Sequence, residues 1–382
     1  MKIGFDAKRA YNNNTGLGHY SRTLIKDLAK FFTQEEYVLF TPKVSNLFEI
    51  ETNENISIVT PTTFLSKVFK KIWRSNWVKN DCERLGIDLY HGLSHQIPKG
   101  LKNSAIKTVV TIHDLIFERY PAQHGKINVL LYRKKFKYAC KSADAIIAIS
   151  EQTKNDLIKF YKVPQEKINV CYQTCNASFM QKCSDAELHK ITTKYNLPKQ
   201  YFLWVGSITE RKNLLTVCKA LKNINNNIPL AVIGDGRKYK SEVKLFLKQN
   251  SIEHKVIFLS ETLAGQSADF KNSKDFPAIY QGAALFIYTS IFEGFGIPIL
   301  EALCSGVPII ASNVSCMPET AGNAAIYVHP YDDIDLAKKM LMVIEDENLK
   351  KTMTTNGYIH AQNFTPEKCT TAVINVYKKI LQ

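Results

Sequence analysis

The sequence predicts an α/β protein with two doubly wound domains, in which helices cover both faces of a parallel sheet. Three observations predict this class. Short apolar runs alternate with longer segments of helical period along the whole chain. Many of these runs are continuously apolar, as in strands that are buried on both faces. The length of 382 residues suits two domains of ordinary size, and we expect the two to face a central cleft.

Six segments in the first half of the chain are expected to form strands. They are residues 2–6, 37–40, 57–60, 88–91, 107–114 and 144–150. Longer segments of helical period separate them, most clearly 21–32 and 150–161. This alternation favours parallel neighbours, because parallel strands need a crossover connection.

The second half repeats the pattern. Its expected strands are residues 201–206, 229–234, 255–259, 284–290, 307–312 and 324–330. A stretch without strand character interrupts the series between the two halves. We therefore expect an N-terminal domain over 1–175, a linker over 176–199 and a second domain over 200–364. Residues 365–382 are expected to form a C-terminal helix that packs back toward the N-terminal domain.

The composition is that of a soluble globular protein, with 45% hydrophobic and 22% charged residues. No run approaches the roughly 20 apolar residues of a membrane span, and the start of the chain lacks a signal-peptide pattern. We therefore expect a cytoplasmic protein. Its nine cysteines include no CxxC pair, so reduced thiols and no metal site are expected.

The positive charge is concentrated in the first half. The net charge is +15, and residues 1–175 carry 27 Lys and Arg against 16 Asp and Glu. Such a domain favours an anionic partner, which could be a phosphate, a nucleic acid or an acidic membrane surface. No nucleic-acid-binding motif is present, and the basic residues do not alternate with aromatic residues on strands. Nucleic acid is therefore not expected as a partner.

Two loops that follow expected strands of the first domain are candidate binding loops, because ligands of open parallel sheets bind beyond the carboxyl ends of the strands. In residues 15–24, Gly16 and Gly18 would allow a phosphate to approach a helix N-terminus. The alternative is an ordinary loop that closes onto the helix. His113 follows the strand near residue 112, where its imidazole could donate a hydrogen bond to a substrate hydroxyl. The alternative is a histidine that caps the strand end.

A basic loop opens the second domain. In residues 204–215, Arg211 and Lys212 stand side by side after a strand and Gly206. The pair precedes a helix, a position that suits neutralisation of a diphosphate. The alternative is a pair of solvated surface cations.

The segment 293–301, "EGFGIPILE", contains two glutamates in different settings. Glu293 lies in the expected loop before a helix, and Glu301 lies about one turn inside that helix. The backbone N–H groups of Gly296 and Ile297 would meet an anionic group at the helix start. An acid in an otherwise apolar helix needs a partner, so Glu301 is a candidate ligand contact. The alternative is a tight turn that leads into a buried helix.

The segment 65–79 is predicted to form an amphipathic helix. Its apolar face contains Leu65, Val68, Phe69, Ile72 and Trp73, and Lys67, Lys70, Lys71 and Arg74 lie opposite. One interpretation is a helix on an anionic membrane, with Trp77 near the interface. The other is a helix packed on the sheet with its lysines in water, and this is the interpretation we favour, because such helices are usual in soluble domains. A second basic stretch at 132–141 adds to the charge of the same domain.

Taken together, these segments resemble the retaining glycosyltransferases of the GT-B fold, in the large family numbered four. The resemblance covers nearly the whole chain. It is carried by "GFDAKRAYNNNTGLGHYSRTLIKDL", "TIHDLIFERYP", "ADAIIAISEQTKNDLIKFY", "GSITERKN" and "TSIFEGFGIPILEALCSGVPIIASNVSCMPETAG". Two glutamates separated by seven residues, between a strand and a helix, are the most specific part. The resemblance implies two Rossmann-like domains, with the acceptor on the N-terminal domain and the nucleotide sugar on the C-terminal domain.

The resemblance also implies roles for the second domain. Glu293 matches a family glutamate that contacts the transferred sugar, and Glu301 matches one that holds the ribose hydroxyls of the nucleotide. Between them, the backbone of Gly294, Phe295 and Gly296 would lie beside sugar and phosphate, with the N–H of Ile297 at the helix start.

Further roles follow for the two basic residues and for the first domain. Lys212 with Arg211 resembles the cationic pair that offsets charge on the leaving diphosphate. Gly16 resembles a glycine that approaches that diphosphate, and His113 resembles a residue that touches the sugar. Many members have arginine directly after the glycine that matches Gly206, but here Ser207 stands there. Residues 261–274 are longer than the usual link, and we expect a polar surface loop.

The activity implied by the resemblance is retaining, metal-independent transfer of a hexose-type sugar such as mannose, rhamnose or glucose. The donor would be a GDP-, UDP- or dTDP-linked sugar, and no cofactor is expected. The acceptor would be a saccharide or a polyprenyl-diphosphate-linked saccharide of an O-antigen, capsule or exopolysaccharide. Such an acceptor predicts peripheral contact of the N-terminal domain with the cytoplasmic face of the inner membrane. The alternatives are a nucleotide-sugar epimerase or other enzyme of the same fold, and a non-catalytic scaffold that binds nucleotide sugars.

Overall fold

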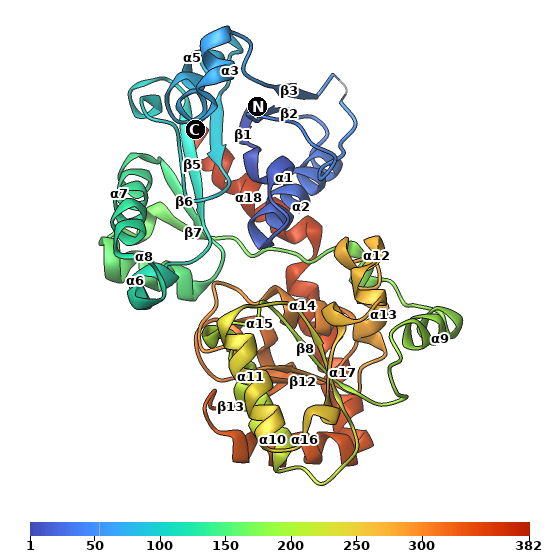
Figure 1. Cartoon of the computed structure of the whole chain (residues 1–382). Helices are drawn as coiled ribbons and strands as arrows, with labels where there is room; N and C mark the ends of the chain where they lie inside the picture. The colour runs from blue at the N-terminus through green and yellow to red at the C-terminus, as the bar shows by residue number, and fades with distance from the viewer. Residues whose placement is uncertain (53) are drawn as a thin grey trace. The chain divides into compact units, whose positions relative to one another are not determined.

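The computed structural model describes residues 1–52 and 54–382. The chain forms two compact units (Figure 1). Unit 1 consists of Met1–Thr174 together with Phe364–Gln382, and unit 2 consists of Cys175–Asn363. Each unit contains one sheet whose neighbouring strands are all parallel, and helices connect most pairs of successive strands. The predicted fold class, two doubly wound α/β domains, is confirmed.

The sheet of unit 1 has seven strands in the order β3-β2-β1-β4-β5-β6-β7. Their bounds are β1 Lys2–Asp6, β2 Glu36–Phe40, β3 Ile56–Val59, β4 Leu89–Gly92, β5 Lys107–Ile112, β6 Ala145–Ala148 and β7 Ile168–Val170. The order reverses at β1, which pairs with both β2 and β4. The six strands predicted in this half are confirmed. The seventh, β7, was missed because it is only three residues long and contains Asn169.

The helices of unit 1 connect its strands, except for the last helix, which follows unit 2 in sequence. They are α1 Lys8–Asn12, α2 Gly16–Phe31, α3 Phe64–Val68, α4 Lys70–Ile72, α5 Val78–Arg84, α6 Ile116–Arg119, α7 Lys126–Ser142, α8 Glu151–Tyr161 and α18 Pro366–Leu381. Helix α8 begins where the Ser150 hydroxyl accepts a hydrogen bond from the backbone N–H of Thr153, a standard N-cap contact.

The last helix belongs to unit 1, although the whole of unit 2 precedes it in sequence. Helix α18 packs against α2 and contacts β5 and β6 (Figure 1). At its end, the hydroxyl of Tyr377 lies 2.5 Å from His91 Nδ1, and His91 Nε2 lies 2.8 Å from the Thr111 hydroxyl. The Tyr20 hydroxyl continues this buried chain of contacts to α2. Buried polar groups that are all satisfied hold the helix in one position.

Unit 2 contains a six-stranded sheet in the order β10-β9-β8-β11-β12-β13. The bounds are β8 Phe202–Val205, β9 Leu230–Ile233, β10 Val256–Phe258, β11 Leu285–Tyr288, β12 Ile309–Ser312 and β13 Ala325–Val328. All six were predicted from their apolar runs. The four middle strands are fully buried, and their side chains form the core with α10 and α16.

The helices of unit 2 connect these strands and flank the sheet. They are α9 Asp185–Lys194, α10 Leu214–Lys222, α11 Lys238–Gln249, α12 Ala268–Lys271, α13 Phe276–Gln281, α14 Ile297–Cys304, α15 Met317–Ala321, α16 Asp333–Glu345 and α17 Glu347–Ala361. The segment 176–199, treated above as a linker, contains α9 and belongs to this unit. Both Lys194 Nζ and the Tyr195 hydroxyl lie 2.6 Å from the Asp275 carboxylate, so the segment is tied to the start of α13.

Two local predictions differ from the structure. The polar surface loop expected over 261–274 is instead partly helical, because Ser267 caps α12 and the ring of Phe270 is buried against Tyr195 and Phe276. The continuous helix expected over 65–79 breaks at Phe69 and passes through a π-helical turn, Trp73–Trp77.

The packing expected for the segment 65–79 is also wrong. Of its apolar face, only Trp73 is buried, whereas Leu65, Val68, Phe69 and Ile72 are exposed. The favoured interpretation, a helix packed on the sheet through this face, therefore does not hold. No helix in the described part of the chain has the length and apolar character needed to cross a membrane.

Candidate functional site

The carboxyl ends of β8 and β9 approach each other closely through two glycines. Gly206 and Gly234 have φ values of +155° and +148°, which favour glycine. A Cβ on Gly234 would lie 1.8 Å from the carbonyl oxygen of Gly206, so no side chain fits there. A Cβ on Gly206 would touch the Lys212 side chain at 3.4 Å. Gly206 therefore lies beside Lys212 of the predicted basic pair. Gly234 was not among the residues predicted from the sequence.

The loop after β8 is fixed to the end of β11. It forms a 3₁₀ turn over Glu210–Lys212, followed by Asn213 in the left-handed region with a φ of 58°. The Asn213 carbonyl accepts a hydrogen bond from the Thr289 hydroxyl at 3.0 Å, and the Arg211 carbonyl accepts one from the N–H of Ile291 at 2.8 Å. These two hydrogen bonds hold the loop against the segment that contains Glu293.

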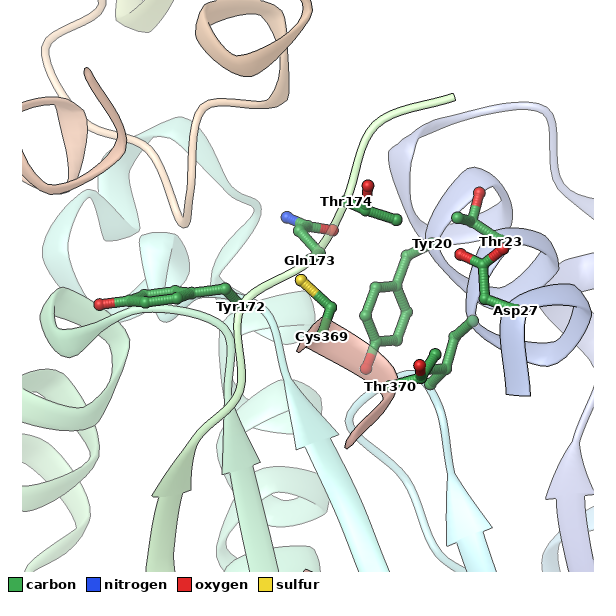
Figure 2. A pocket seen from close by; sticks show the side chains of 9 residues that line it. Tyr20, Thr23, Asp27, Tyr172, Gln173, Thr174, Cys369 and Thr370 are labelled. Carbon is green, nitrogen blue, oxygen red and sulfur yellow. The ribbon is translucent and has the colours of Figure 1, made fainter. Parts of the chain in front are cut away.

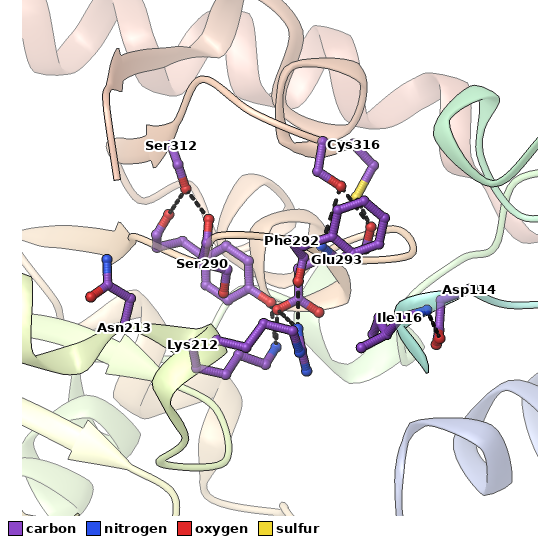
Figure 3. A network of polar contacts seen from close by, with 12 residues as sticks. Asp114, Ile116, Lys212, Asn213, Ser290, Phe292, Glu293, Ser312 and Cys316 are labelled. Carbon is purple, nitrogen blue, oxygen red and sulfur yellow. Dashed lines mark hydrogen bonds and ion pairs between the residues drawn. The ribbon is translucent and has the colours of Figure 1, made fainter. Parts of the chain in front are cut away.

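Glu293 makes an ion pair with both predicted cations (Figure 3). Its carboxylate lies 2.7 Å from Arg211 Nη1 and 2.7 Å from Lys212 Nζ. Lys212 is only 9% exposed and Glu293 only 8%, so the group is largely shielded from water. The alternative interpretation of Arg211 and Lys212 as solvated surface cations is therefore wrong.

The pKa shifts in this cluster have opposing causes. Burial alone would raise the pKa of Glu293, but the charges of Lys212 and Arg211 outweigh it and lower the pKa. Burial lowers the pKa of Lys212, and Arg211 lowers it further, whereas Glu293 acts in the opposite direction. The cluster thus contains an ionised carboxylate and two nitrogen cations in a poorly hydrated setting, with a net positive charge.

Tyr288, at the end of β11, supports Lys212. Its hydroxyl accepts a hydrogen bond from Lys212 Nζ at 2.7 Å, and the ammonium lies 5.0 Å from the ring centroid. Both contacts favour a cation. This contact with Lys212 could not be predicted from the sequence, because Tyr288 is simply the last residue of an apolar strand.

The backbone of Glu293 is held by the loop after β12 (Figure 3). Its carbonyl accepts hydrogen bonds from the Ser315 hydroxyl at 2.8 Å and from the Cys316 thiol at 3.3 Å. Ser312, at the end of β12, donates to the carbonyls of Tyr288 and Ser290. Three neighbouring strand ends thus fix the position of this one carboxylate.

Helix α14 begins after a left-handed glycine. Gly296 is the N-cap with a φ of +94°, and Ile297 is the first helical residue. The Phe295 side chain is buried, and its carbonyl accepts a hydrogen bond from the Thr320 hydroxyl. Gly294 follows Glu293 in the same turn. The turn leads the chain directly from Glu293 to the free N–H groups of a helix start, where anions are favoured.

Glu301 lies within α14 and has a different partner from Glu293. Its carboxylate accepts a hydrogen bond from the Tyr280 hydroxyl at 2.8 Å. Burial raises the pKa of Glu301 to about 7, an effect that the Tyr280 hydrogen bond and the charge of Lys212 oppose. The acid therefore has the partner that an apolar helix requires, and a pKa near neutrality is common at functional sites. Tyr280 was not predicted from the sequence because, like Tyr288, it lies within an apolar segment.

The glycines of the N-terminal loop differ in their surroundings. A Cβ on Gly18 would lie 1.9 Å from the Asn13 carbonyl oxygen, so this glycine is required by packing. A Cβ on Gly16, at the start of α2, would meet nothing within 4 Å. Gly18 is therefore explained by closure of the loop onto the helix. Of the two glycines, Gly16 is the one that borders open space in which a ligand could bind.

His113 lies directly after β5 and is buried. Its Nε2 lies 2.9 Å from the Leu93 carbonyl oxygen, which can only accept, so Nε2 carries the proton. Burial lowers the pKa of His113 to about 3, and nearby His95 contributes in the same direction. The one N–H of the neutral ring, at Nε2, is therefore already bonded to the Leu93 carbonyl. The expectation that His113 donates a hydrogen bond to a substrate hydroxyl is thus corrected, because the remaining ring nitrogen, Nδ1, has no proton and can only accept one.

A small cavity lies in unit 1 beneath the segment that leads out of it (Figure 2). It is lined by Tyr20, Thr23, Leu24, Asp27, Tyr172, Gln173, Thr174, Cys369 and Thr370. Asp27 Oδ2 is buried and has no hydrogen-bond partner within residues 1–52 and 54–382. Burial raises the pKa of this carboxyl to about 6. The cavity is too narrow for a sugar, and none of the predicted site residues lines it.

The structure thus brings Arg211, Lys212, Glu293 and Gly206 together, and it places Glu301 within α14, the helix that follows Glu293. Gly16, Gly18 and His113 lie in the other unit. Among the described residues, no three His, Cys, Asp or Glu side chains form a group that could hold a metal ion.

The known proteins that this chain resembles are glycosyltransferases. A family model described as glycosyl transferases group 1 matches residues 185–360, and one described as glycosyltransferase family 4 matches residues 15–178. O-antigen chain mannosyltransferase B of Escherichia coli is 28% identical over 396 residues, covering 99% of this chain and all of the relative. O-antigen chain mannosyltransferase RfbU of Salmonella typhimurium is 29% identical, over 63% of this chain and 60% of its own.

Solved structures agree on the fold. The crystal structure of Anabaena Alr3699/HepE in complex with UDP-glucose has a TM-score of 0.74 at 17% identity. The match covers 99% of this chain and all of the other.

Proposed function

The chain belongs to the group 1 glycosyltransferases of the GT-B fold, and we propose that it transfers a hexose, with retention of configuration, from a nucleotide sugar to a growing surface polysaccharide. The observation that carries this proposal is the buried cluster of Glu293, Arg211 and Lys212. Two relatives act in O-antigen synthesis as mannosyltransferases, which supports mannose as the first donor sugar to test. The nucleotide is GDP, UDP or dTDP.

The two cations suit the leaving group. When the bond between the sugar C1 and the phosphate oxygen breaks, negative charge grows on the diphosphate and positive charge on the sugar ring. Lys212 is buried and Arg211 is partly buried, and both are already fixed by Glu293, so they need little rearrangement to stabilise that charge. We therefore assign them to the diphosphate, together with the helix start at Gly296 and Ile297.

Glu293 orients the sugar and holds the cations in place. One carboxylate oxygen contacts both cations, and we assign the carboxylate to accept a hydrogen bond from a sugar hydroxyl. Its lowered pKa keeps it an acceptor at neutral pH. In a retaining reaction the acceptor hydroxyl enters from the face that the phosphate leaves, and its proton passes to a phosphate oxygen. These cations then take the part that a metal ion has in other transferases.

Glu301 is assigned to the ribose hydroxyls of the nucleotide. Tyr280 holds one carboxylate oxygen and leaves the other to accept. In unit 1, Gly16 leaves room for a diphosphate, and His113 Nδ1 can accept a hydrogen bond from a hydroxyl of the sugar. The acceptor is a saccharide or a saccharide linked to a polyprenyl diphosphate.

The test is acceptor-dependent turnover. Purified protein is incubated with GDP-mannose, UDP-glucose and dTDP-rhamnose, with and without a polyprenyl-diphosphate-linked saccharide, and the released nucleoside diphosphate is measured. We expect release from one donor only when the acceptor is present, and an unchanged anomeric configuration in the product by NMR. Equal consumption without acceptor would instead indicate an epimerase. Binding of a donor without consumption under any condition would indicate a scaffold.

A further inference from the structure

Two cysteines of unit 2 that are far apart in sequence have their sulfurs in contact. The sulfurs of Cys175 and Cys304 lie 3.6 Å apart, although 129 residues separate the two, and both are reduced thiols. Cys175 is 3% exposed and Cys304 is 9% exposed. The sulfurs need to approach by only about 1.6 Å to reach the roughly 2.0 Å of a disulfide bond. The pair is therefore placed for oxidation.

The packing of unit 2 maintains this contact. Cys304 is the last residue of α14. Cys175 lies two residues before a 3₁₀ turn, Ala177–Met180, that contacts α14. Within this turn, the buried ring of Phe179 packs against Tyr280, with the ring centroids 5.2 Å apart. The turn thus holds Cys175 against the end of α14.

The pair lies next to the carboxylate that we assign to the ribose. Glu301 precedes Cys304 by three residues, so the two side chains are on the same face of α14. The hydrogen bond to Cys304 and burial raise the pKa of Cys175 well above its ordinary value, and the charge of Glu301 adds to this effect. Cys175 is therefore close to both residues, and oxidation of the pair would act within one helical turn of Glu301.

The two thiols have different parts in an oxidation. Cys304 is the more exposed of the two, so a small neutral oxidant meets it first. Cys175 donates its S–H toward the Cys304 sulfur, and its raised pKa keeps that proton in place at neutral pH. Because the thiolate is the reactive form, Cys304 suits the first attack and Cys175 suits the second.

We propose that Cys175 and Cys304 form an oxidative modification site, at which hydrogen peroxide converts the two thiols into a disulfide. The Cys304 thiolate attacks one peroxide oxygen, the O–O bond breaks, and Cys304 becomes a sulfenic acid while hydroxide leaves and takes up the thiol proton. The Cys175 sulfur then attacks the Cys304 sulfur. The S–O bond breaks, the S–S bond forms, and the proton of Cys175 leaves with the hydroxide as water. The two thiols lose two electrons, and one peroxide gains them and gives two waters.

The disulfide should weaken nucleotide binding, a consequence that rests on the proposed role of Glu301. Closing the bond draws the last turn of α14 toward Cys175. Glu301 belongs to this part of the helix, and its hydrogen bond from Tyr280 is 2.8 Å long in the reduced protein. A displaced carboxylate loses part of its hydrogen bonding, so we expect the oxidised protein to bind nucleoside diphosphate several-fold more weakly.

Mass spectrometry of the full chain tests the modification itself. The protein is treated with hydrogen peroxide, the remaining thiols are alkylated, and the tryptic peptides are analysed before and after dithiothreitol. We expect a linked pair of peptides that dithiothreitol separates. The peptide that contains Cys175 also contains Cys171, and that of Cys304 also contains Cys316, so fragment ions assign the linked sulfurs. Wild type without a Cys175–Cys304 link in excess peroxide would overturn the proposal.

Serine variants test the order of the two steps. Cys175→Ser and Cys304→Ser should each abolish the link. In Cys175→Ser, Cys304 should persist as a sulfenic acid that dimedone labels, whereas Cys304→Ser should leave Cys175 unlabelled. Cys183→Ser, at a partly exposed thiol outside the pair, is the matched control and should form the link in wild-type yield. Labelling of Cys175 in Cys304→Ser would contradict the order. The wild-type link stands as evidence even if a variant folds poorly.

Calorimetry of nucleotide binding tests the consequence for Glu301. GDP, UDP and dTDP are each titrated into reduced and oxidised wild type. We expect oxidation to weaken the tightest of them several-fold, dithiothreitol to restore its affinity, and peroxide to leave the affinity of Cys304→Ser unchanged. A linked protein with unchanged affinity would overturn the effect on Glu301. Reduced wild type that binds none of the three would instead contradict the proposed function, and the disulfide would still form.

Discussion

The carboxylate of Glu293 lies 2.7 Å from Arg211 Nη1 and equally close to Lys212 Nζ, although 82 residues separate Glu293 from Arg211. The ends of β8 and β11 and their loops bring the three charges together, and hydrogen bonds to the backbone carbonyls of Arg211 and Glu293 fix them. The free protein therefore already holds two cations in one place with a single anion. This relationship underlies the account of leaving-group stabilisation.

Removing the ammonium of Lys212 should affect catalysis more than donor binding. We expect Lys212→Met to lower kcat about 100- to 1,000-fold, the usual effect of losing one group that stabilises transition-state charge. Tyr288→Phe removes only the hydroxyl that accepts from Lys212, so a loss of about tenfold is expected. Steady-state kinetics measure both, with the exposed Lys219→Met as control. Unchanged kcat in Lys212→Met would contradict the assignment.

Removing Glu293 should destabilise unit 2. Glu293→Ala leaves the buried Lys212 and the partly buried Arg211 without their carboxylate, and breaking a buried ion pair in this way costs about 3 kcal/mol in the free energy of unfolding. Adding Lys212→Met to this variant should restore part of the stability, because one unpaired cation disappears. Urea denaturation followed by circular dichroism measures these changes, with Glu242→Ala as an exposed control. A double variant less stable than Glu293→Ala alone would argue against the pairing.

The two glycines of the N-terminal loop should behave differently. Gly18→Ala places a methyl group against the Asn13 carbonyl, so we expect a lower melting temperature. Gly16→Ala meets no atom within 4 Å, so the melting temperature should not fall. If a diphosphate comes close to Gly16, this variant should nevertheless transfer sugar more slowly. Full transfer activity in Gly16→Ala would remove Gly16 from the site.

Asp27 should make unit 1 less stable as the pH rises. Its pKa is about 6 in the folded protein against 3.8 as the reference, so folding favours the protonated form. The folded state therefore loses stability as pH rises from about 4 through 6. Asp27→Asn should raise stability at pH 8 by on the order of 1 kcal/mol, since the residue is half-buried and partly screened. At pH 4 the variant should match the wild type.

Thermal melting at the two pH values measures the effect of Asp27. Asp185→Asn, at an exposed position, serves as control. An equal gain at both pH values would mean that the effect comes from packing and not from the proton.

The sequence predicted the sheets well because each buried parallel strand is a continuous apolar run. Twelve such runs were identified, and β7 was missed because three residues with a polar centre give no such run. The break at Phe69 was also missed. Ser66 and Trp73 hold the segment through hydrogen bonds to Thr63 and Asp81, which helical periodicity does not encode.

The site was predicted only for residues whose chemistry stands out locally. Glu293, Arg211 and Lys212 are charged residues directly after apolar strands, which marks them as candidates. Tyr288 and Tyr280 lie within apolar runs, and their hydroxyls reveal a role only when Lys212 and Glu301 are placed beside them. The direction of the His113 hydrogen bond likewise depends on the Leu93 carbonyl, 20 residues away.

The central claim, that this chain binds the nucleotide of a donor sugar through Glu301, is tested most directly by isothermal titration calorimetry. The donor nucleoside diphosphate is titrated into wild type and into Glu301→Gln at pH 6 and at pH 8. Burial raises the pKa of Glu301 to about 7, so its carboxylate is mostly ionised only at the higher pH. An ionised carboxylate is the stronger acceptor for ribose hydroxyls. We expect wild type to bind several-fold more tightly at pH 8 than at pH 6, beyond any change in Glu301→Gln. That variant should bind at least tenfold more weakly at pH 8. Equal affinity and equal pH dependence in the two proteins would contradict the account.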